Sequence, residues 1–208
     1  MYVPPSFHET DEARVDALLA RNPFATLITP TPERLWISHV PLLARRRQGA
    51  LVLEGHLARA NGHWQALQAG TETTAVFHGP HAYVSPTWYA TAPAVPTWNY
   101  AVVHAVGRAD VRDNAEDAAA LVTALTNAYE SGRPDGWRAD GLPTELRRSL
   151  LGAIVAFELR VAHLEAKFKL GQNRGEADRI GAIVALEAAG TDDTRALAAL
   201  MRATLADG

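Results

Sequence analysis

One stretch of the sequence gathers polar residues of the types that hold a phosphate group. In GHLARANGHW, residues 55–64, the side chains of His56, Arg59, Asn61 and His63 gather at what looks like the exit of a strand. A chain that leaves a strand for a helical turn offers free backbone N–H groups, and an arginine beside them can bind a phosphate through two parallel hydrogen bonds. His39, in the strand-like segment SHVPLL, is a further candidate.

A second polar cluster lies late in the chain, in EAKFKLGQNR. Lys167, Lys169, Gln172, Asn173 and Arg174 crowd the end of another expected strand. Each cluster, taken alone, also fits a solvated strand end, because charged residues are mostly exposed in folded proteins. The spacing therefore leaves two interpretations open, an anion-binding site and a polar surface.

Between the two clusters, residues 79–100 read GPHAYVSPTWYATAPAVPTWNY and concentrate the aromatic residues of the chain. They hold two of the five tryptophans, three of the five tyrosines and four of the twelve prolines. A proline-rich loop cannot easily place large rings in a helix or a strand ladder. The rings therefore either pack over a neighbouring surface or contact a flat ligand. With the polar clusters, they outline a pocket for a flat ring that carries a phosphate.

Several other kinds of site are excluded or disfavoured. The chain has no cysteine, which excludes disulfides and thiol chemistry. It also lacks a paired-carboxylate motif, a nucleophile elbow and a glycine-rich phosphate loop, and no catalytic residue is assigned. His78 and His81 stand three apart across Gly79-Pro80 and cannot share a helical face. Without an acidic or cysteine partner nearby, they favour a structural role over a metal site.

The elements that position these residues follow from hydrophobic periodicity and turn signals. We expect strands over 24–31, 34–47, 50–58, 71–86, 98–113 and 153–170, the fourth interrupted at Gly79-Pro80. Helices are expected over 11–21, 114–132, 143–153, 176–190 and 191–207, with Thr191 as a cap and a short helix or turn over 58–70. Strands in short hairpins followed by helices favour an α+β fold, an antiparallel barrel of about six strands. We expect a single domain over 1–208, with a helical appendage over 175–208.

Composition and charge restrict the class of partner. The chain has 208 residues and a net charge of −3, whereas DNA-binding proteins usually carry a basic face that supplies most of their affinity. This counts against DNA binding by a monomer, although a dimer could still pair two small basic patches. DNA binding is therefore not supported by the charge. The run Arg45-Arg46-Arg47 is most simply a solvated hairpin tip, with a phosphate contact as the alternative. Neither a basic leader nor 18 consecutive apolar residues occur, so we expect a cytoplasmic protein without a membrane segment.

Five motifs in a fixed order give the chain a family resemblance. MYVPPSF, GHLARANGHW, FHGPHAYVSPTWY, VPTWNY and KFKLGQNR closely resemble the PaiB family, and the resemblance runs from Met1 to about Leu186. Members of this family are described as FMN-binding negative transcriptional regulators. They are related to the flavin split-barrel proteins, which include the pyridoxamine phosphate oxidases. The resemblance implies an FMN-binding split β-barrel and a homodimer with flavin at the subunit interface.

The resemblance also assigns roles to matching residues. His39 and Arg59 with Asn61, and His56 beside them, match the positions that meet the FMN phosphate. The residues expected beside the flavin or the partner subunit are Trp88 or Trp98, Asn99, Lys167, Lys169, Gln172 and Asn173. The aromatic rings would otherwise simply fill the dimer interface. Gly171 and Gly62 depart from the serine and proline that are usual in the family, which implies weaker retention of FMN.

Three functions are compatible with these assignments. The first is a flavin-binding negative regulator, because no catalytic acid or base stands out. The second is an enzyme of the NAD(P)H:flavin reductase or oxidase type, or a haem-handling protein with His78, His81 or His104 as axial ligand, since a flavin itself carries the redox chemistry. The third is a dimeric interaction module that has lost its cofactor. Reduction of bound flavin by NAD(P)H with turnover distinguishes the second from the others.

Overall fold

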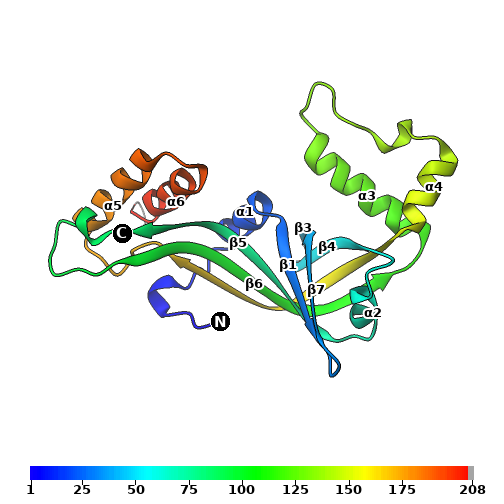
Figure 1. Ribbon diagram of the computed structural model, residues 1–208, viewed down its shortest axis with the longest axis horizontal. Helices are drawn as coiled ribbons and strands as arrows, with labels where there is room; N and C mark the ends of the chain where they lie inside the picture. The colour runs from blue at the N-terminus through cyan, green and yellow to red at the C-terminus, as the bar shows by residue number, and fades with distance from the viewer. Residues whose placement is uncertain (206–208) are drawn as a thin grey trace. The chain divides into compact units, whose positions relative to one another are not determined.

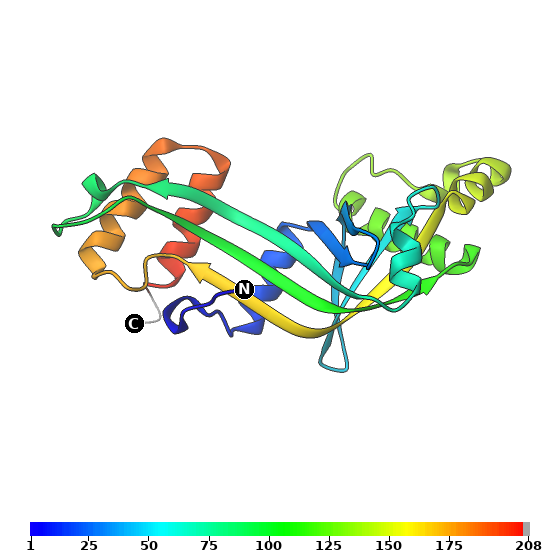
Figure 2. The same ribbon diagram turned by 60° about the horizontal axis from the view of Figure 1, so that its bottom comes forward.

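The computed structural model describes residues 1–205, apart from the side chain at position 140. The chain divides into two compact units. The terminal unit comprises Met1–Asn22, Phe77–His104 and the chain from Glu165 onward, and the central unit comprises Pro23–Val76 and Ala105–Leu164. Three long strands contribute residues to both units: β5 (Glu72–Val84), β6 (Thr97–Arg112) and β7 (Ile154–Lys169). They run side by side in Figure 2.

Across the described residues, one sheet of seven strands has the order β2-β1-β5-β6-β7-β4-β3. The four remaining strands are β1 (Phe24–Pro30), β2 (Leu35–Pro41), β3 (Leu43–Arg47) and β4 (Ala50–Ala58), and Figure 1 labels all seven. Strand β1 pairs antiparallel with β2 and β5, and β4 pairs antiparallel with β3 and β7. The expected antiparallel sheet of an α+β fold is confirmed, with seven strands instead of about six.

The additional strand comes from the segment 34–47, which we expected to be one strand. It is broken at Leu42 into β2 and β3, which stand at opposite ends of the strand order although this single residue joins them. Pro41 has no N–H to continue the ladder, and Leu42 is buried and donates its own N–H to Pro23 O at 2.9 Å. The two sheet edges therefore meet at this corner, and the sheet closes into a barrel.

The expected interruption of the fourth strand is wrong, because β5 runs unbroken through Gly79-Pro80. Gly79 is required there by packing. A Cβ at this position would stand 2.8 Å from Leu18 Cδ1 and 3.0 Å from Ala101 O. The glycine thus lets the helix that carries Leu18 approach the strand. Gly79-Pro80 therefore indicates close packing of this helix on β5 and not the end of a strand.

The helices of the terminal unit are α1 (Glu12–Arg21), α5 (Glu176–Ala189) and α6 (Asp192–Ala203). Asp11 caps α1 by accepting from Ala13 N–H at 2.8 Å, and Thr191 caps α6 as expected from the sequence. Helices α5 and α6 pack on each other as a hairpin. Leu186, Leu197 and Met201 are buried in this unit.

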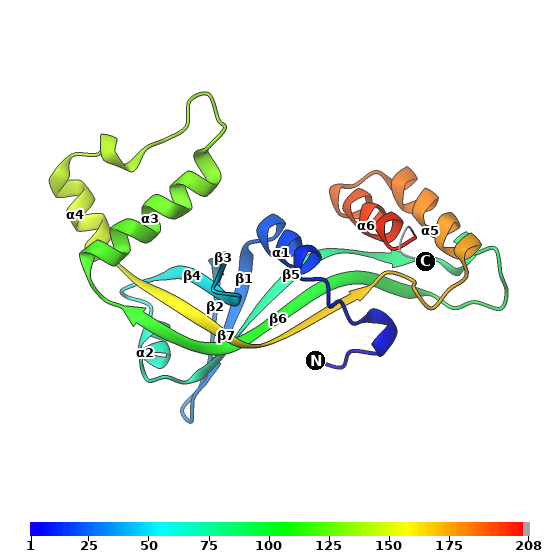
Figure 3. The same cartoon turned by 180° about the vertical axis from the view of Figure 1, so that it is seen from behind.

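The helices of the central unit are α2 (His63–Gln68), α3 (Ala115–Glu130) and α4 (Thr144–Gly152), and α3 and α4 pack side by side (Figure 3). Asn114 caps α3 by accepting from Asp117 N–H at 2.9 Å. Short 3-10 helices occur at Pro5–Phe7, Pro86–Trp88 and Ala139–Gly141. None of the described helices is long and apolar enough to cross a membrane.

Candidate functional site

Arg59 lies at the exit of β4, where the sequence predicts a phosphate contact. Its guanidinium is anchored within the central unit. Nη2 donates to Asp113 Oδ1 at 2.5 Å and to Ile154 O at 3.1 Å, and Nε donates to Gly152 O at 2.8 Å. Nη1 takes no part in these three bonds, and the side chain of Arg59 is 42% exposed. Arg59 therefore holds a fixed orientation and can offer one remaining edge to an anion.

Asn61 is held by a hydrogen-bond chain that starts at its own amide. Asn61 Nδ2 donates to Ser38 Oγ at 3.1 Å, and Asn61 Oδ1 accepts from His63 N–H at 3.1 Å. Ser38 Oγ lies 2.8 Å from His63 Nδ1. Since the amide nitrogen can only donate, the serine hydroxyl is free to give its proton to Nδ1. The strand exit and β2 are thus linked through these three side chains.

The same chain continues into the interior and fixes the tautomer of His63. His63 Nε2 lies 2.8 Å from Thr29 Oγ1, which lies 2.7 Å from Thr73 Oγ1, which donates to Thr71 O at 3.2 Å. Because Thr73 gives its proton to a carbonyl, Thr29 donates to Thr73 and accepts from the Nε2–H of a neutral His63. The chain ends on a backbone carbonyl, so it orients groups and offers no exit for a proton.

His63 itself is fully buried, which the sequence did not indicate. Its ring stacks on Trp36 with centroids 5.8 Å apart, and the guanidinium of Arg34 lies 4.1 Å above the Trp36 ring. Burial, and secondly the nearby Arg34, lower the pKa of His63 to about 4. Gly62, where proline is usual in the family, also follows from the packing of Trp36. A Cβ at position 62 would stand 2.8 Å from Trp36 Cη2.

The two other histidines of the predicted phosphate group lie in different surroundings. His39 is exposed on β2, its Nδ1 3.1 Å from Thr26 Oγ1. His56, on β4, lines an apolar cavity beneath α3 and α4. Its Nδ1 is buried without a hydrogen-bond partner, and burial lowers its pKa. His39 is therefore exposed, as expected for a residue that contacts a phosphate. His56 instead faces the apolar cavity.

In the terminal unit, the two lysines of the late motif contact the aromatic segment. Lys167 is buried, donates to Tyr2 O at 3.1 Å, and lies 5.5 Å from the centroid of the Tyr100 ring. Lys169 Nζ donates to Trp98 O at 2.8 Å and to Thr97 Oγ1. Burial lowers the pKa of Lys169. Both lysines therefore stabilise strand β6 where the aromatic loop returns to the sheet.

Asn99 and Gln172, also predicted to face the flavin, have intramolecular partners. Asn99 is buried, with Nδ2 3.6 Å from Met201 Sδ. Gln172 accepts from Leu170 N–H at 2.7 Å and donates to Phe168 O at 2.6 Å, which closes the turn after β7. Asn173 is exposed in this turn. Gly171 there has φ of 84°, a conformation that favours glycine over the serine usual in the family.

The remainder of the motif anchors the proline-rich loop. The guanidinium of Arg174 lies 4.6 Å from the centroid of the Tyr89 ring. Asp178, which is 2% exposed, accepts from Thr91 N–H at 2.9 Å and from Thr91 Oγ1 at 2.7 Å. Gly181 on α5 packs directly against Trp88 O. Loop and helix thus form one packed structure within the terminal unit, and the backbone of Trp88 packs on α5.

Trp98, in contrast, is 52% exposed and lies on an aromatic face of β5 and β6. Its ring centroid is 5.8 Å from that of His81 and 6.4 Å from that of Tyr83. A hollow of about 300 Å³ follows this face, and its lining residues are His78, Gly79, His81, Trp98, Tyr100, Ala101 and Val102. An open, flat, aromatic hollow of this kind can accommodate a planar ring.

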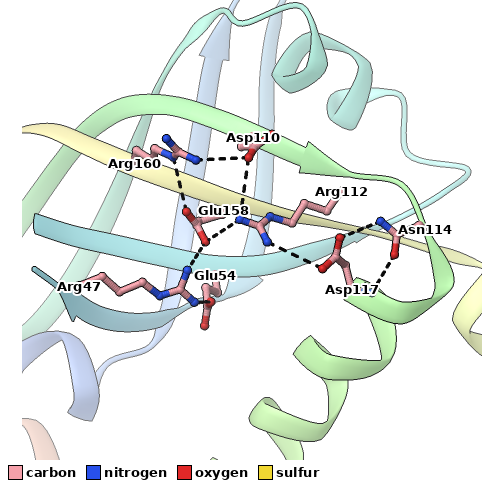
Figure 4. Close-up of polar contacts among 8 residues, drawn as sticks. All are labelled: Arg47, Glu54, Asp110, Arg112, Asn114, Asp117, Glu158 and Arg160. Carbon is pink, nitrogen blue, oxygen red and sulfur yellow. Dashed lines mark hydrogen bonds and ion pairs between the residues drawn. The ribbon is translucent and has the colours of Figure 1, made fainter.

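The arginine run at 45–47 is engaged in ion pairs and is not simply a solvated tip (Figure 4). Glu158, 5% exposed, accepts from Arg47 Nη1 at 2.5 Å and Arg112 Nη2 at 3.1 Å, with Arg160 Nε at 3.5 Å. Arg47 also pairs with Glu54. No sequence pattern indicated this network, because most of its members lie far apart along the chain. Within the described part of the chain, no group of three or more histidines and acidic residues is arranged to bind a metal.

Comparison with known proteins identifies relatives over nearly the whole chain. Residues 1–163 match the family described as "Putative FMN-binding domain". The chain is 33% identical over 201 residues to the protease synthase and sporulation protein PAI 2 of Bacillus subtilis, covering 97% of this chain and 96% of the relative. It is 29% identical to an uncharacterized protein of Aspergillus fumigatus over 242 aligned residues, covering 92% and 93%.

Solved structures resemble the fold at low sequence identity. The flavocytochrome Anf3 of Azotobacter vinelandii has a TM-score of 0.61 at 16% identity, covering 79% of this chain and 70% of that one. An FAD- and heme-binding protein of Mycobacterium smegmatis also has a TM-score of 0.61, at 20% identity, with coverage of 88% and 80%. At these identities the likeness concerns the fold alone, and it confirms the expected split β-barrel.

Proposed function

The chain belongs to the PaiB family of FMN-binding domains, and from this premise we propose that it binds FMN between two subunits and acts as a negative regulator of transcription. The observation that carries the FMN assignment is the family match over residues 1–163, which includes the strand exit at Arg59 and the aromatic face at Trp98. The bound flavin supplies electron or hydride chemistry, and the protein binds and orients it.

The strand exit of the central unit fits the phosphate end of FMN. Arg59 keeps one guanidinium edge outside its three intramolecular bonds, and His39 is exposed with Nε2 outside its bond to Thr26. Asn61 is fixed by its hydrogen bond to Ser38. An arginine edge and an imidazole on a strand surface can bind a phosphate dianion. We assign the FMN phosphate to His39, Arg59 and Asn61.

The aromatic face of the terminal unit fits the isoalloxazine ring. Trp98 and Tyr83 are 52% and 45% exposed and lie against each other, and a contiguous exposed apolar patch often marks a surface that binds a partner or a ligand. Lys169 holds the Trp98 backbone and Lys167 lies against Tyr100. Asn99 and Gln172 are then supports of this face and its adjoining turn, whereas Asn173, exposed in that turn, stays a candidate flavin contact.

A homodimer brings the two surfaces together, with the phosphate residues of one subunit and the aromatic face of the other. Exposed apolar side chains support an interface between copies, since Phe24, Leu35 and Ile37 on β1 and β2 are 66%, 54% and 54% exposed. Such a row on adjacent strands is a surface that association buries.

Regulation through a protein partner or a metabolite fits the charge distribution better than direct reading of DNA. The net charge is −3. In the basic run, Arg45 Nε lies 2.9 Å from Glu54 Oε2, and Arg47 pairs with Glu54 and Glu158. Neutralised arginines of this kind contribute little of the phosphate neutralisation on which DNA affinity depends.

The first test is the absorption spectrum of the protein after it has been mixed with excess FMN and desalted. Retained flavin bands at about 370 and about 450 nm are expected. A protein that stays colourless and binds no FMN in titrations contradicts the proposal and favours an interaction module without cofactor. Sustained oxidation of NAD(P)H by the loaded protein contradicts the regulatory part and favours an oxidoreductase.

The second test asks whether each site is built from two subunits. Arg59→Ala and Trp98→Ala variants are each expected to bind FMN weakly. After unfolding and refolding as a mixture, the heterodimer has one site with both residues intact, so about a quarter of all sites should regain affinity. Sites built within one subunit regain none, which would contradict the shared site while leaving FMN binding itself intact.

A further inference from the structure

The central unit contains an apolar cavity that the proposed flavin site does not use. It lies where α3, the Ala139–Gly141 turn and α4 cover the end of β4, and its volume is about 310 Å³. Most of its lining is aliphatic or aromatic: Ala119, Val122, Trp137, Ala139, Leu142, Leu150, Leu151 and Ile154. The polar residues in the lining are His56, Thr123 and Arg147. A volume at the lower end of ligand pockets suits a single ring.

His56 presents an unsatisfied polar atom in this cavity. Its Nδ1 is buried and has no hydrogen-bond partner among the described residues. Buried polar atoms are nearly always paired in folded proteins, and an exception calls for a ligand or another explanation. Burial lowers the pKa of His56, so at neutral pH the ring is uncharged. A neutral imidazole can exchange one hydrogen bond with a hydroxyl group.

Arg147, on α4, is the charged residue of the lining. Its guanidinium makes no ion pair and no side-chain hydrogen bond within the part of the chain that the structure describes, and it is only half-exposed. The next residue differs, because Arg148 Nη1 lies 2.6 Å from Glu145 on the same helix. Thr123 is already engaged, donating to Ala119 O at 2.8 Å. Arg147 is therefore the group in the cavity that can bind an anion.

The apolar side chains around the cavity are incompletely covered. Trp137 is 49% exposed and Leu150 is 52% exposed, although both line the same cavity. A bound ring would bury part of both side chains. The occupant must thus combine a flat apolar body, one negative charge and one hydrogen-bonding group.

We propose that this cavity binds a small hydroxylated aromatic carboxylate, with the carboxylate on Arg147, the ring against Trp137 and Leu150, and the hydroxyl on His56 Nδ1. Such a ligand satisfies the guanidinium of Arg147 and the unpaired Nδ1 of His56 together. A guanidinium binds a carboxylate bidentately, which gives direction as well as charge. The cavity would give the protein an effector site separate from the flavin, and the inference does not depend on flavin binding.

The test is calorimetric titration of the full chain with 2-, 3- and 4-hydroxybenzoate, benzoate and benzamide. One hydroxybenzoate isomer should bind best, benzoate more weakly, and neutral benzamide least. Arg147→Gln should weaken the best isomer by about tenfold or more, as expected for loss of a charge-assisted pair. Arg148→Gln is the matched control, one residue away on the same helix, and should bind as the unaltered protein does. His56→Leu should remove the preference for the hydroxybenzoate over benzoate.

Several outcomes overturn the proposal. One is that none of the three isomers shows measurable binding at concentrations up to about 10 mM. Another is that Arg147→Gln and Arg148→Gln lose affinity equally. A third is that the probes do not bind and Trp137→Ala converts a dimer to a monomer. This result would mean that the cavity is part of an interface between two copies of the chain. Thermal unfolding checks that each variant folds. If His56→Leu does not fold, the comparison of Arg147→Gln with Arg148→Gln still decides the question. FMN affinity should be unchanged in Arg147→Gln.

Discussion

Arg59 Nη2 lies 2.5 Å from Asp113 Oδ1, so the arginine predicted to bind the FMN phosphate already holds a carboxylate. The two groups perturb each other: the hydrogen bond raises the pKa of Arg59 and lowers that of Asp113. The backbone carbonyls of Gly152 and Ile154 accept from the same guanidinium. Asp113 is therefore a competitor of the phosphate, while the carbonyls keep the guanidinium oriented without it.

Asp113→Asn is expected to tighten FMN binding several-fold, because it removes the competing negative charge and retains the orienting carbonyls. Arg59→Ala is expected to weaken binding by about tenfold or more, the usual effect of losing a charged hydrogen bond. Quenching of flavin fluorescence measures both. Asp135→Asn, an exposed change of the same charge, should have no effect. If Asp113→Asn weakens binding as much as Arg59→Ala, the ion pair is part of the binding geometry instead.

The burial of neutral His63 predicts a loss of stability in acid. The unfolded chain takes up a proton at the ordinary pKa of 6.5, whereas the folded chain does so only at about pH 4. The free energy of unfolding should therefore fall as pH decreases from 6.5 toward 4, and by about 2 kcal/mol between pH 7 and pH 5 from this group, since one pKa unit corresponds to about 1.4 kcal/mol.

Urea unfolding at pH 7 and pH 5 measures this dependence. His63→Gln should be less stable at pH 7 and should lose most of the difference between the two pH values. Burial also lowers the pKa of His56 and His104, so a smaller dependence should remain. His39→Gln, on the exposed surface of β2, is the control and should keep the original dependence. An unchanged dependence in His63→Gln would show that this histidine is not the source.

Glu158 is the centre of the ion-pair network of Figure 4, and its removal should destabilise the central unit. Glu158→Ala leaves Arg47, Arg112 and Arg160 without their shared acceptor. Breaking a buried pair costs about 3–5 kcal/mol, but these arginines are partly exposed, so we expect about 2 kcal/mol. Glu145→Ala removes an exposed pair with Arg148 and should cost less than about 0.5 kcal/mol. Equal values for the two variants in urea unfolding would contradict a central role for Glu158.

Asp178 should keep the proline-rich loop in place through its two bonds to Thr91. In Asp178→Ala, amide hydrogen exchange at Thr91 and its neighbours is expected to accelerate by about tenfold, as for the loss of one or two modest hydrogen bonds. Asp192→Ala, on the fully exposed first turn of α6, is the control. Exchange in residues 86–92 that stays unchanged in Asp178→Ala would mean that packing of Trp88 on α5 suffices to hold the loop.

Most helices and strands were predictable because local periodicity determines them, as in β4 and α3, whose expected bounds agree with the structure within one or two residues. The break at Leu42 was not predictable. It lies within the continuous apolar run at 40–44, and only closure of the sheet distinguishes one long strand from two. Likewise, Gly79 resembles a strand break in the sequence, but its reason is a neighbour, Leu18, from another element.

The candidate site, too, could be predicted from the sequence only in part. The clusters around Arg59 and Lys167 were visible as motifs, since their members are close in sequence. Their partners were not, because Asp113 and Tyr2 are distant along the chain from Arg59 and Lys167. His63 was grouped with polar surface residues by its type, although two hydroxyl groups and a tryptophan ring make it a core residue. Asn99 was assigned to the flavin by its motif, but it packs against Met201.

The one-residue corner at Leu42 restricts how this protein can change in length during evolution. Side chains alternate between the faces of a strand, so inserting or deleting one residue at the corner would turn every following side chain of β3 to the opposite face. Arg45 and Arg47 would then point away from Glu54 and Glu158, while His39 on the other side of the corner would stay where it is. Relatives that keep both His39 and the ion pairs are thus expected to keep the length of this corner constant and to accept insertions in other loops.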